Sequence, residues 1–132
     1  MKGEQLVFSR FDLVFLIVGA VAGAYLRYKI GSASIFYHGI PLTILVINVV
    51  GSFVLGLSMS TIQRFGLSQS YTILLGVGFC GSLTTMSSFA YEAEGLLDGA
   101  KLLLGFLDVV LNVGLSIAAV FVGKTIIQLL FG

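Results

Sequence analysis

Long apolar stretches separated by short polar segments divide this sequence into four parts. Residues 11–30, 41–63 and 101–128 are apolar over most of their length, and a charge-free stretch lies between Arg64 and Glu92. Each stretch is long enough for a membrane-spanning helix, which needs about 20 residues. The pattern predicts an all-α integral membrane protein with four transmembrane helices joined by short connections.

Composition supports a membrane protein and argues against several soluble classes. The chain has 132 residues, of which 58% are hydrophobic and 10% are charged. Four spans leave little chain for a soluble domain, so we expect residues 1–132 to form one transmembrane domain in the cell membrane, surrounded by lipid. The net charge of +1 provides no basic surface, so nucleic acid is not an expected partner.

The first apolar stretch contains two glycines that predict close helix packing. Gly19 and Gly23, in "GAVAGA", stand four positions apart and therefore share one helix face. Small residues at this spacing let two helices approach closely in lipid. We interpret the stretch as a retained first helix rather than a cleaved signal peptide, because it is rich in glycine and ends at Arg27.

The third stretch is unusually polar for the middle of a membrane. It contains "GFCGSLTTMSSFAYE", and most of residues 76–88 are Gly, Cys, Ser or Thr. Glycine lowers helix propensity by about 1 kcal/mol relative to Ala, so an unbroken helix would gain nothing from this composition. Non-helical backbone is tolerated at membrane depth where it is buried in protein or lines a cavity, and its free carbonyls can hold ions. We therefore predict a broken third helix that handles an ion.

Polar side chains after the break follow a helical spacing. Thr85, Ser88 and Glu92 stand at steps of three and four, so they form one polar stripe on a helix, with Met86 and Phe89 on an adjoining stripe. Two interpretations stay open for the hydroxyls. They line an ion path, or they bond back to the carbonyl four residues earlier.

The other apolar stretches also carry isolated polar residues. Asn48 lies among Ile, Leu and Val, and is either a site residue or an interhelical hydrogen-bonding residue. Asn112 and Ser116 stand one turn apart on the fourth stretch. Asp108 lies inside the start of that stretch, and it either pairs with a basic end group such as Arg27 or reaches the membrane interface.

Charge gives the chain almost no preferred orientation. With both termini on one side, that side carries Lys2, Arg10, Arg64 and Lys124, and the other carries Arg27, Lys29 and Lys101. Basic residues normally accumulate on the cytoplasmic side, so such a small difference permits insertion in both directions. This would allow an antiparallel dimer whose twofold axis lies in the membrane plane.

Four segments in order resemble the Fluc/CrcB fluoride channel family over nearly the whole chain. They are "GAVAGAYLRY" (residues 19–28), "ILVINVVGSFVLG" (residues 44–56), "GFCGSLTTMSSFAYE" (residues 78–92) and "LNVGLSIAAVFVG" (residues 111–123). The resemblance implies a fluoride-selective passive channel that relieves fluoride toxicity, assembled as an antiparallel, dual-topology homodimer. It also implies a structural sodium ion (Na⁺) at the dimer interface, held by the backbone carbonyls of Gly81 and Thr84 and the same pair of the partner.

The resemblance further implies the residues of the fluoride pore. Carried to this chain, they are Asn48, Thr85, Met86, Ser88, Phe89, Glu92, Ser116 and, at a vestibule end, Arg27. The family has two phenylalanines on the third helix, and here the first of them is replaced by Met86, which has no electropositive ring edge. The hydroxyl expected before Asn48 is missing or displaced, because Thr43 and Ile44 stand where the family commonly has Gly and Thr.

Two other functions fit a small four-helix membrane protein. A small multidrug-resistance-type proton antiporter needs a carboxylate in the middle of its first helix, whereas residues 13–26 contain no acid. A non-transporting assembly subunit would explain Gly19 and Gly23, but not a broken helix followed by a hydroxyl stripe. An enzyme is not expected, because no catalytic set converges on plausible helix faces, and the chain has no GxxxxGK[ST] phosphate-binding motif.

Overall fold

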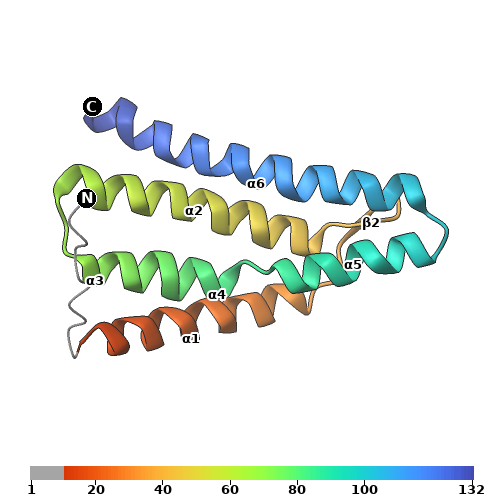
Figure 1. Ribbon diagram of the computed structural model, residues 1–132, viewed down its shortest axis with the longest axis horizontal. Coiled ribbons are helices and arrows are strands. Elements are labelled where there is room, and N and C mark those ends of the chain that lie inside the picture. The colour runs from red at the N-terminus through yellow and green to blue at the C-terminus, as the bar shows by residue number, and fades with distance from the viewer. Residues whose placement is uncertain (1–10) are drawn as a thin grey trace, which may run out of the picture.

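The chain forms an elongated helical bundle in which four segments are long and apolar enough to cross a membrane (Figure 1). The computed structural model describes residues 11–132, and these four spans are counted within that range. They are Asp12–Gly31, Thr43–Phe65, Gln69–Asp98 and Leu102–Phe131. The predicted all-α architecture with four transmembrane helices is therefore confirmed, as a multi-pass membrane protein.

The elements follow one another along the chain with short connections. They are α1 (Asp12–Gly31), β1 (Phe36–Tyr37), β2 (Ile40–Pro41), α2 (Thr43–Phe65), α3 (Gln69–Tyr71), the π-helix η1 (Thr72–Cys80), α4 (Gly81–Leu83), α5 (Met86–Asp98) and α6 (Leu102–Phe131). The third span consists of α3, η1, α4 and α5 in succession. Consecutive spans run in opposite directions along the bundle (Figure 1).

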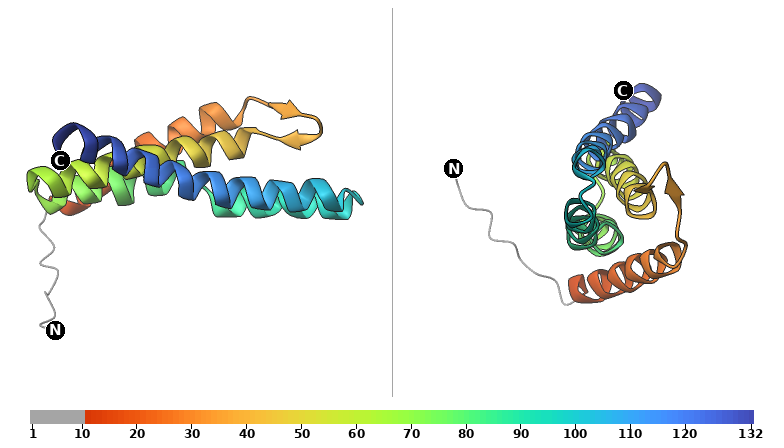
Figure 2. Two further views of the ribbon diagram at one scale, coloured as in Figure 1. Left: turned by 90° about the horizontal axis from the view of Figure 1, so that it is seen from above. Right: turned by 90° about the vertical axis from the view of Figure 1, so that its right-hand side faces the viewer.

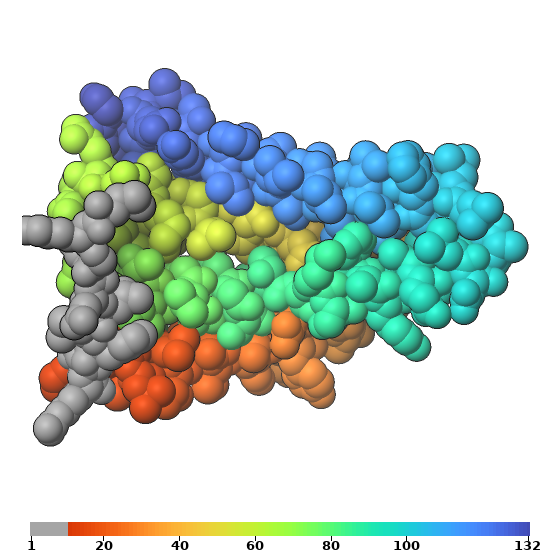
Figure 3. Space-filling view, viewed as in Figure 1, coloured from red at the N-terminus to blue at the C-terminus, as the bar shows by residue number. Residues whose placement is uncertain are grey.

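The spans lie side by side with α1 and α6 farthest apart. In the space-filling view, α1 forms one edge, α6 forms the opposite edge, and the third span lies between them (Figure 3). Of the basic residues that bear on orientation, Lys2 and Arg10 lie outside the described residues. Arg64 and Lys29 occupy the last turns of α2 and α1, which end at opposite ends of the bundle.

Large apolar side chains cover much of the outer surface. Val21 of α1 is 64% exposed, and Phe106 and Leu129 of α6 are 63% and 80% exposed. A water-soluble protein rarely exposes apolar patches on this scale. This surface suits lipid or a second subunit, as a transmembrane domain requires.

The predicted glycine face of α1 packs against the third span. A Cβ atom built on Gly19 would lie 2.1 Å from the carbonyl oxygen of Leu74, and one on Gly23 would lie 2.2 Å from that of Phe79. Gly78 faces Gly19 from the other side, with its own Cβ position 3.0 Å from the Gly19 Cα. The two backbones therefore approach within a distance that only glycine permits.

The connection between α1 and α2 differs from the prediction. The second helix was predicted from residue 41, but Pro41 lies in β2, which pairs with β1 as a two-stranded antiparallel hairpin. His38 and Gly39 form its turn with positive φ angles of 49° and 87°. Proline suits an edge strand because it needs no ladder partner for its missing N–H. The hairpin projects from the bundle in Figure 2.

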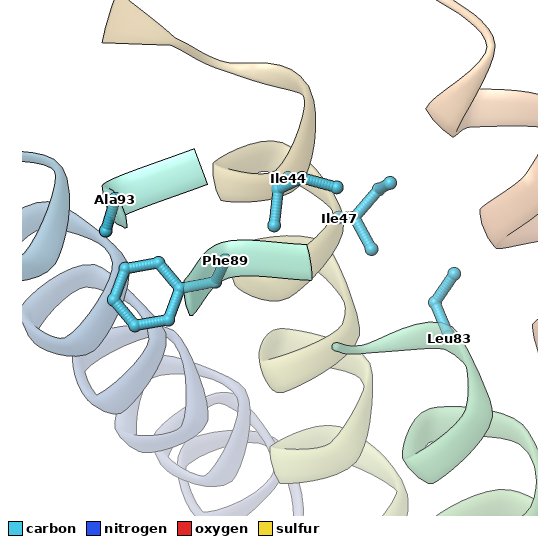
Figure 4. Packing of buried hydrophobic residues seen from close by; sticks show 5 residues of the cluster. All are labelled: Ile44, Ile47, Leu83, Phe89 and Ala93. Atoms are coloured by element: carbon cyan, nitrogen blue, oxygen red, sulfur yellow. The ribbon is translucent and has the colours of Figure 1, made fainter. Parts of the chain in front are cut away.

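A small apolar cluster holds the break of the third span against α2. Its buried members are Ile44, Ile47, Leu83, Phe89 and Ala93. Figure 4 shows Ile44 and Ile47 on α2, Leu83 at the end of α4, and the Phe89 ring extending from α5 toward α6. Ile47 and Leu83 are each only 1% exposed. The break therefore has a buried apolar support on one side.

Candidate functional site

The predicted break of the third span lies between α4 and α5. Thr84 and Thr85 both have extended backbone, with φ and ψ of −72° and 153° for Thr84 and −148° and 117° for Thr85. Two consecutive extended residues cannot continue the helical hydrogen bonds, so the helix ends at Leu83 and resumes at Met86. The prediction of a broken third helix within residues 76–88 is confirmed.

The side chain of Asn48 on α2 pairs with the broken backbone. The N–H of Thr85 donates to Asn48 Oδ1 at 2.9 Å, and Asn48 Nδ2 donates to the Thr85 carbonyl oxygen at 3.3 Å. One amide thus satisfies both backbone groups of a residue at membrane depth, where unpaired groups are costly. The hydrogen bonds attach the break to α2.

The carbonyls of Gly81 and Thr84 are among those that the break releases from the helix. In a continuous helix the Gly81 carbonyl would accept from the Thr85 N–H, which here donates to Asn48 instead. The Thr84 carbonyl would accept from the Ser88 N–H, which here donates to Thr85 Oγ1 at 3.2 Å. Gly81 and Thr84 are the two residues expected to hold a cation through their carbonyls.

Thr85 also begins the second half of the span as the N-cap of α5. Besides accepting from the Ser88 N–H, its Oγ1 lies 3.2 Å from the hydroxyl oxygens of Ser87 and Ser88. An N-cap threonine satisfies one of the free N–H groups at the start of a helix. The hydroxyls of Thr85 and Ser88 therefore bond to each other at the break, rather than to carbonyls four residues earlier.

A second amide on α6 extends the hydrogen bonding from Asn48. Asn48 Nδ2 donates to Asn112 Oδ1 at 3.1 Å, and Asn112 Nδ2 donates to the backbone oxygen and Oδ1 of Asp108 at 3.2 and 3.0 Å. Both N–H groups of the Asn48 amide thus have acceptors inside the chain. The interhelical hydrogen bonding that the sequence left open for Asn48 is present in the structure.

Asp108 differs from both sequence-based alternatives. Its side chain is 0% exposed, so it does not reach the membrane interface. Its Oδ2 has no hydrogen-bond partner among residues 11–132, so it does not pair with Arg27. Instead, Asp108 faces the interior of the bundle and accepts from Asn112, because α6 turns this side toward α2 and α5.

A cavity of about 350 Å³ lies beside the break. Predicted site residues that line it are Asn48, Gly81, Thr84, Thr85, Met86, Phe89 and Ser116. Apolar residues such as Leu55, Val113 and Ile117 form the remaining wall together with Ser52, Gly76, Cys80 and Asn112. The cavity thus joins the freed backbone, hydroxyl and amide groups, and an aromatic ring within an otherwise apolar wall.

Three predicted site residues do not line this cavity. Ser88 lies on α5 between Met86 and Phe89, Glu92 lies farther along α5, and Arg27 lies near the end of α1; all three are half-buried. Glu92 Oε2 is buried without a hydrogen-bond partner among residues 11–132. Their assignment to a pore therefore stays a prediction.

The two residues at the family's phenylalanine positions lie in different environments. Phe89 is 5% exposed and belongs to the apolar cluster, whereas Met86 is 72% exposed at the start of α5. Both line the cavity. Met86 therefore occupies the open side of the cavity and Phe89 its packed side.

Sequence reasoning did not assign three residues that the structure places at the site. Ser52 stands one turn after Asn48 and lines the cavity, and Asn112 stands one turn before Ser116 and bonds to Asn48. Spacing alone could have indicated both. The spacing of four residues between Asp108 and Asn112 could have indicated that they share a helix face. That Asp108 is buried and accepts from Asn112 depends on the packing of the bundle.

Thr43, the displaced hydroxyl of the second span, has a separate function. It is 6% exposed, donates to the Ala33 carbonyl at 2.6 Å and accepts from the Ile35 N–H at 3.0 Å. The hydroxyl anchors the connection between α1 and the hairpin. It is therefore not directed to the cavity.

Comparison with known proteins places the chain in a family. Residues 14–124 match the family described as CrcB-like protein, Camphor Resistance (CrcB). A protein of Nitrosopumilus maritimus named "Fluoride-specific ion channel FluC" is 40% identical over 117 residues, covering 89% of this chain and 93% of the relative. Proteins of the same name from Pyrococcus abyssi and Shewanella halifaxensis are 40% and 36% identical, covering 83% and 88% of this chain and 90% and 95% of the relatives. The chain belongs to the CrcB family.

Proposed function

We propose that this protein is a fluoride-specific passive ion channel of the cell membrane that exports fluoride and relieves its toxicity. The observation that carries the proposal is the match over 89% of the chain to a relative named as a fluoride-specific ion channel. The break and its cavity occur in a transmembrane span, where a permeation site is needed. The relatives are named as channels, so no catalytic residues are assigned.

Passive permeation is sufficient for export. Hydrogen fluoride is a weak acid that crosses membranes when neutral and dissociates inside the cell. A negative interior then drives the anion outward by roughly 2.3 kcal/mol per charge per 100 mV. The channel needs only to let fluoride pass and to exclude the more abundant chloride.

Selectivity is supported by the chemistry of the cavity wall. Fluoride is small and strongly hydrated, so it enters an apolar passage only where donors replace its water. The hydroxyls of Thr85 and Ser116 are such donors, and the electropositive edge of the Phe89 ring adds a further contact. Asn48 belongs to the same site, where it holds the break in place. We assign Ser88, Glu92, Met86 and Arg27 to the path that leads to and from this site.

An antiparallel homodimer completes the proposed channel. The residues at the break include exposed ones, Gly81 and Met86, which one chain leaves uncovered. The nearly even charge distribution permits both orientations, and lipid covers the remaining apolar surface. A second copy in the opposite orientation would cover the break and close the pathways.

The residues at the break fit a structural sodium ion. Sodium is a hard cation that binds oxygen ligands, and the carbonyls of Gly81 and Thr84 have lost the N–H groups that a helix would direct to them. Two oxygens from one chain are an incomplete set, which the same pair of a partner would complete. The ion would supply positive charge that joins two subunits at the break.

Fluoride efflux from liposomes tests the function directly. Purified protein is reconstituted, valinomycin and potassium balance the charge, and fluoride and chloride electrodes record release in parallel. Fast fluoride release without chloride release is expected. Absence of fluoride release from a folded, dimeric sample would overturn the proposal and favour an assembly subunit without transport activity.

A further inference from the structure

Asp108 is a buried acid that the proposed permeation path does not explain. It lies inside α6, one of the membrane spans, and its side chain is 0% exposed. Burying a carboxyl group away from water is costly unless its oxygens are hydrogen-bonded, and Asp108 Oδ2 has no hydrogen-bond partner among residues 11–132. A group retained at such a cost needs a function that an apolar side chain would not supply.

The contacts of Asp108 connect it to the break through two amides. Asn112 Nδ2 donates to Asp108 Oδ1 at 3.0 Å and to the Asp108 backbone oxygen at 3.2 Å. Asn112 Oδ1 in turn accepts from Asn48 at 3.1 Å, and Asn48 Oδ1 accepts from the Thr85 N–H at 2.9 Å. An unbroken series of hydrogen bonds thus runs from α6 through α2 to the third span.

The Asp108 end of this series permits one direction only, and the Thr85 end agrees with it, because the Thr85 carbonyl oxygen accepts from Asn48 Nδ2. A backbone carbonyl and a carboxylate oxygen only accept, so the Asn112 side that faces them must be its NH₂ group. Asn112 therefore presents its oxygen to Asn48, which must answer with its own NH₂ group. The Asn48 oxygen is then left to face the Thr85 N–H.

Reversal of either amide would place like groups against each other. If Asn112 turned over, its NH₂ group would face the NH₂ group of Asn48. If Asn48 turned over to compensate, its NH₂ group would face the N–H of Thr85. Unpaired buried donors are costly, so the acceptors at Asp108, together with the N–H and carbonyl of Thr85, select one arrangement of both amides.

We propose that Asp108 is a positioning residue for the break in the third span, acting through Asn112 to orient Asn48. In that orientation Asn48 takes the Thr85 N–H and leaves the Gly81 carbonyl free. The inference deepens the proposed function, because the break is the site at which the ion is handled. It requires a side-chain acceptor at position 108 beside the backbone carbonyl, which every variant keeps, and it does not require a negative charge there.

Two substitutions separate acceptor from charge. Asp108→Asn keeps an oxygen that accepts from Asn112, whereas Asp108→Leu removes it at similar size. We expect fluoride efflux per dimer within about twofold of wild type for Asp108→Asn and at least about tenfold lower for Asp108→Leu. Val110→Leu, on the exposed side of the same helix, is the control and should conduct normally. Equal impairment of Asp108→Asn and Asp108→Leu, or normal efflux from Asp108→Leu, would overturn the proposal.

A double-mutant cycle tests whether Asp108 acts through Asn112. Asn112→Leu should lower efflux about as much as Asp108→Leu, and the double variant should be no worse than either single one. Additive losses would mean that Asp108 acts on the ion independently. If Asp108→Leu does not elute at the wild-type volume in size-exclusion chromatography, Asp108→Ala replaces it throughout. The alanine variant removes the same side-chain acceptor without added bulk.

Hydrogen exchange gives a readout that does not depend on conduction. Mass spectrometry of a peptide containing Thr85 should show a protected amide in wild type and in Asp108→Asn, and faster exchange in Asp108→Leu and Asn112→Leu. Equal protection in all four proteins would overturn the proposal. If wild type conducts no fluoride, the proposed function fails, while the exchange pattern still decides the role of Asp108.

Discussion

Asn48 pairs with Thr85 as a strand residue would, using its side-chain amide in place of a peptide unit. Its Oδ1 accepts from the Thr85 N–H at 2.9 Å and its Nδ2 lies 3.3 Å from the Thr85 carbonyl oxygen. The arrangement stabilises extended backbone in the middle of a membrane span, because both polar groups of Thr85 stay satisfied. One side chain thereby maintains the interruption on which the proposed ion site depends.

Asn48→Asp should strongly reduce fluoride efflux. The aspartate keeps an acceptor for the Thr85 N–H, but an ionised carboxylate loses both donors and faces the oxygens of Thr85 and Asn112. Each buried group left unpaired costs about 1–3 kcal/mol, so we expect at least about a tenfold loss in the liposome assay. Gln63→Glu, the same chemical change at an exposed position of α2, should conduct normally. Wild-type efflux from Asn48→Asp would show that neither donor is needed.

Gly23→Ala should destabilise the packing of α1 against the third span. The added Cβ would lie 2.2 Å from the carbonyl oxygen of Phe79, so one backbone must move. Overpacking of this kind typically costs about 1–3 kcal/mol, and the thermal midpoint in detergent should fall accordingly. Gly114→Ala is the matched control, since its Cβ meets nothing within 4 Å. That variant should be as stable as wild type or more stable, because alanine is the better helix former.

Phe89→Met should lower conduction more than it lowers stability. Methionine fills a similar volume and packs adaptably, so the apolar cluster around Phe89 stays filled. It has no electropositive ring edge, and aromatic contacts of this type contribute about 0.5–1.5 kcal/mol. We expect efflux about two- to tenfold lower with an unchanged elution volume. Phe121→Met, on the exposed side of α6, should match wild type in both measurements. Unchanged efflux from Phe89→Met would remove the ring edge from the mechanism.

Met86→Phe should conduct at least as well as wild type. Met86 is 72% exposed on the open side of the cavity, so a ring at this position meets no obstacle within the chain. It would restore the second phenylalanine of the family pattern and add a ring edge near the path. Efflux up to several-fold above wild type, about as large as the loss in Phe89→Met, is the expected result. A clear loss of efflux from a dimeric Met86→Phe sample would show that methionine is required at this position.

Hydrophobic patterning was sufficient to predict the four spans, and local composition was sufficient to predict the break. The first was expected over residues 11–30 and is observed as Asp12–Gly31. A membrane-spanning helix requires a long apolar run whichever helices it packs against, so the run alone indicates the span. The break followed from glycine and hydroxyl residues that a lipid-exposed helix would not use. The hairpin was missed because Pro41 suits a helix start as well as an edge strand, and only the pairing with Phe36 decides between them.

Contacts between spans were beyond the reach of sequence patterns. Asn48, Asn112 and Asp108 were each recognised as polar residues in apolar surroundings, but their order in a single series depends on helix rotation and packing. The choice between an interfacial and an interior position for Asp108 likewise depends on which side of α6 faces α2 and α5. Periodicity specifies the faces of one helix and leaves their partners undetermined.

Sodium should stabilise the protein in a manner that depends on the break. A ligand that binds only the folded state at 100 times its dissociation constant adds about 2.7 kcal/mol, so the thermal midpoint should be higher in sodium than in potassium or N-methylglucamine at equal ionic strength.

The carbonyls of Gly81 and Thr84 are backbone groups, which substitution does not remove. Asn48→Leu removes a ligand indirectly. Without the Asn48 acceptor, the Thr85 N–H should donate to the Gly81 carbonyl, which is then no longer free to bind sodium. The sodium-dependent increase should therefore shrink in Asn48→Leu but persist in Gly114→Ala, whose site is unchanged. Equal midpoints for wild type in all three cations would exclude a structural sodium ion at the break.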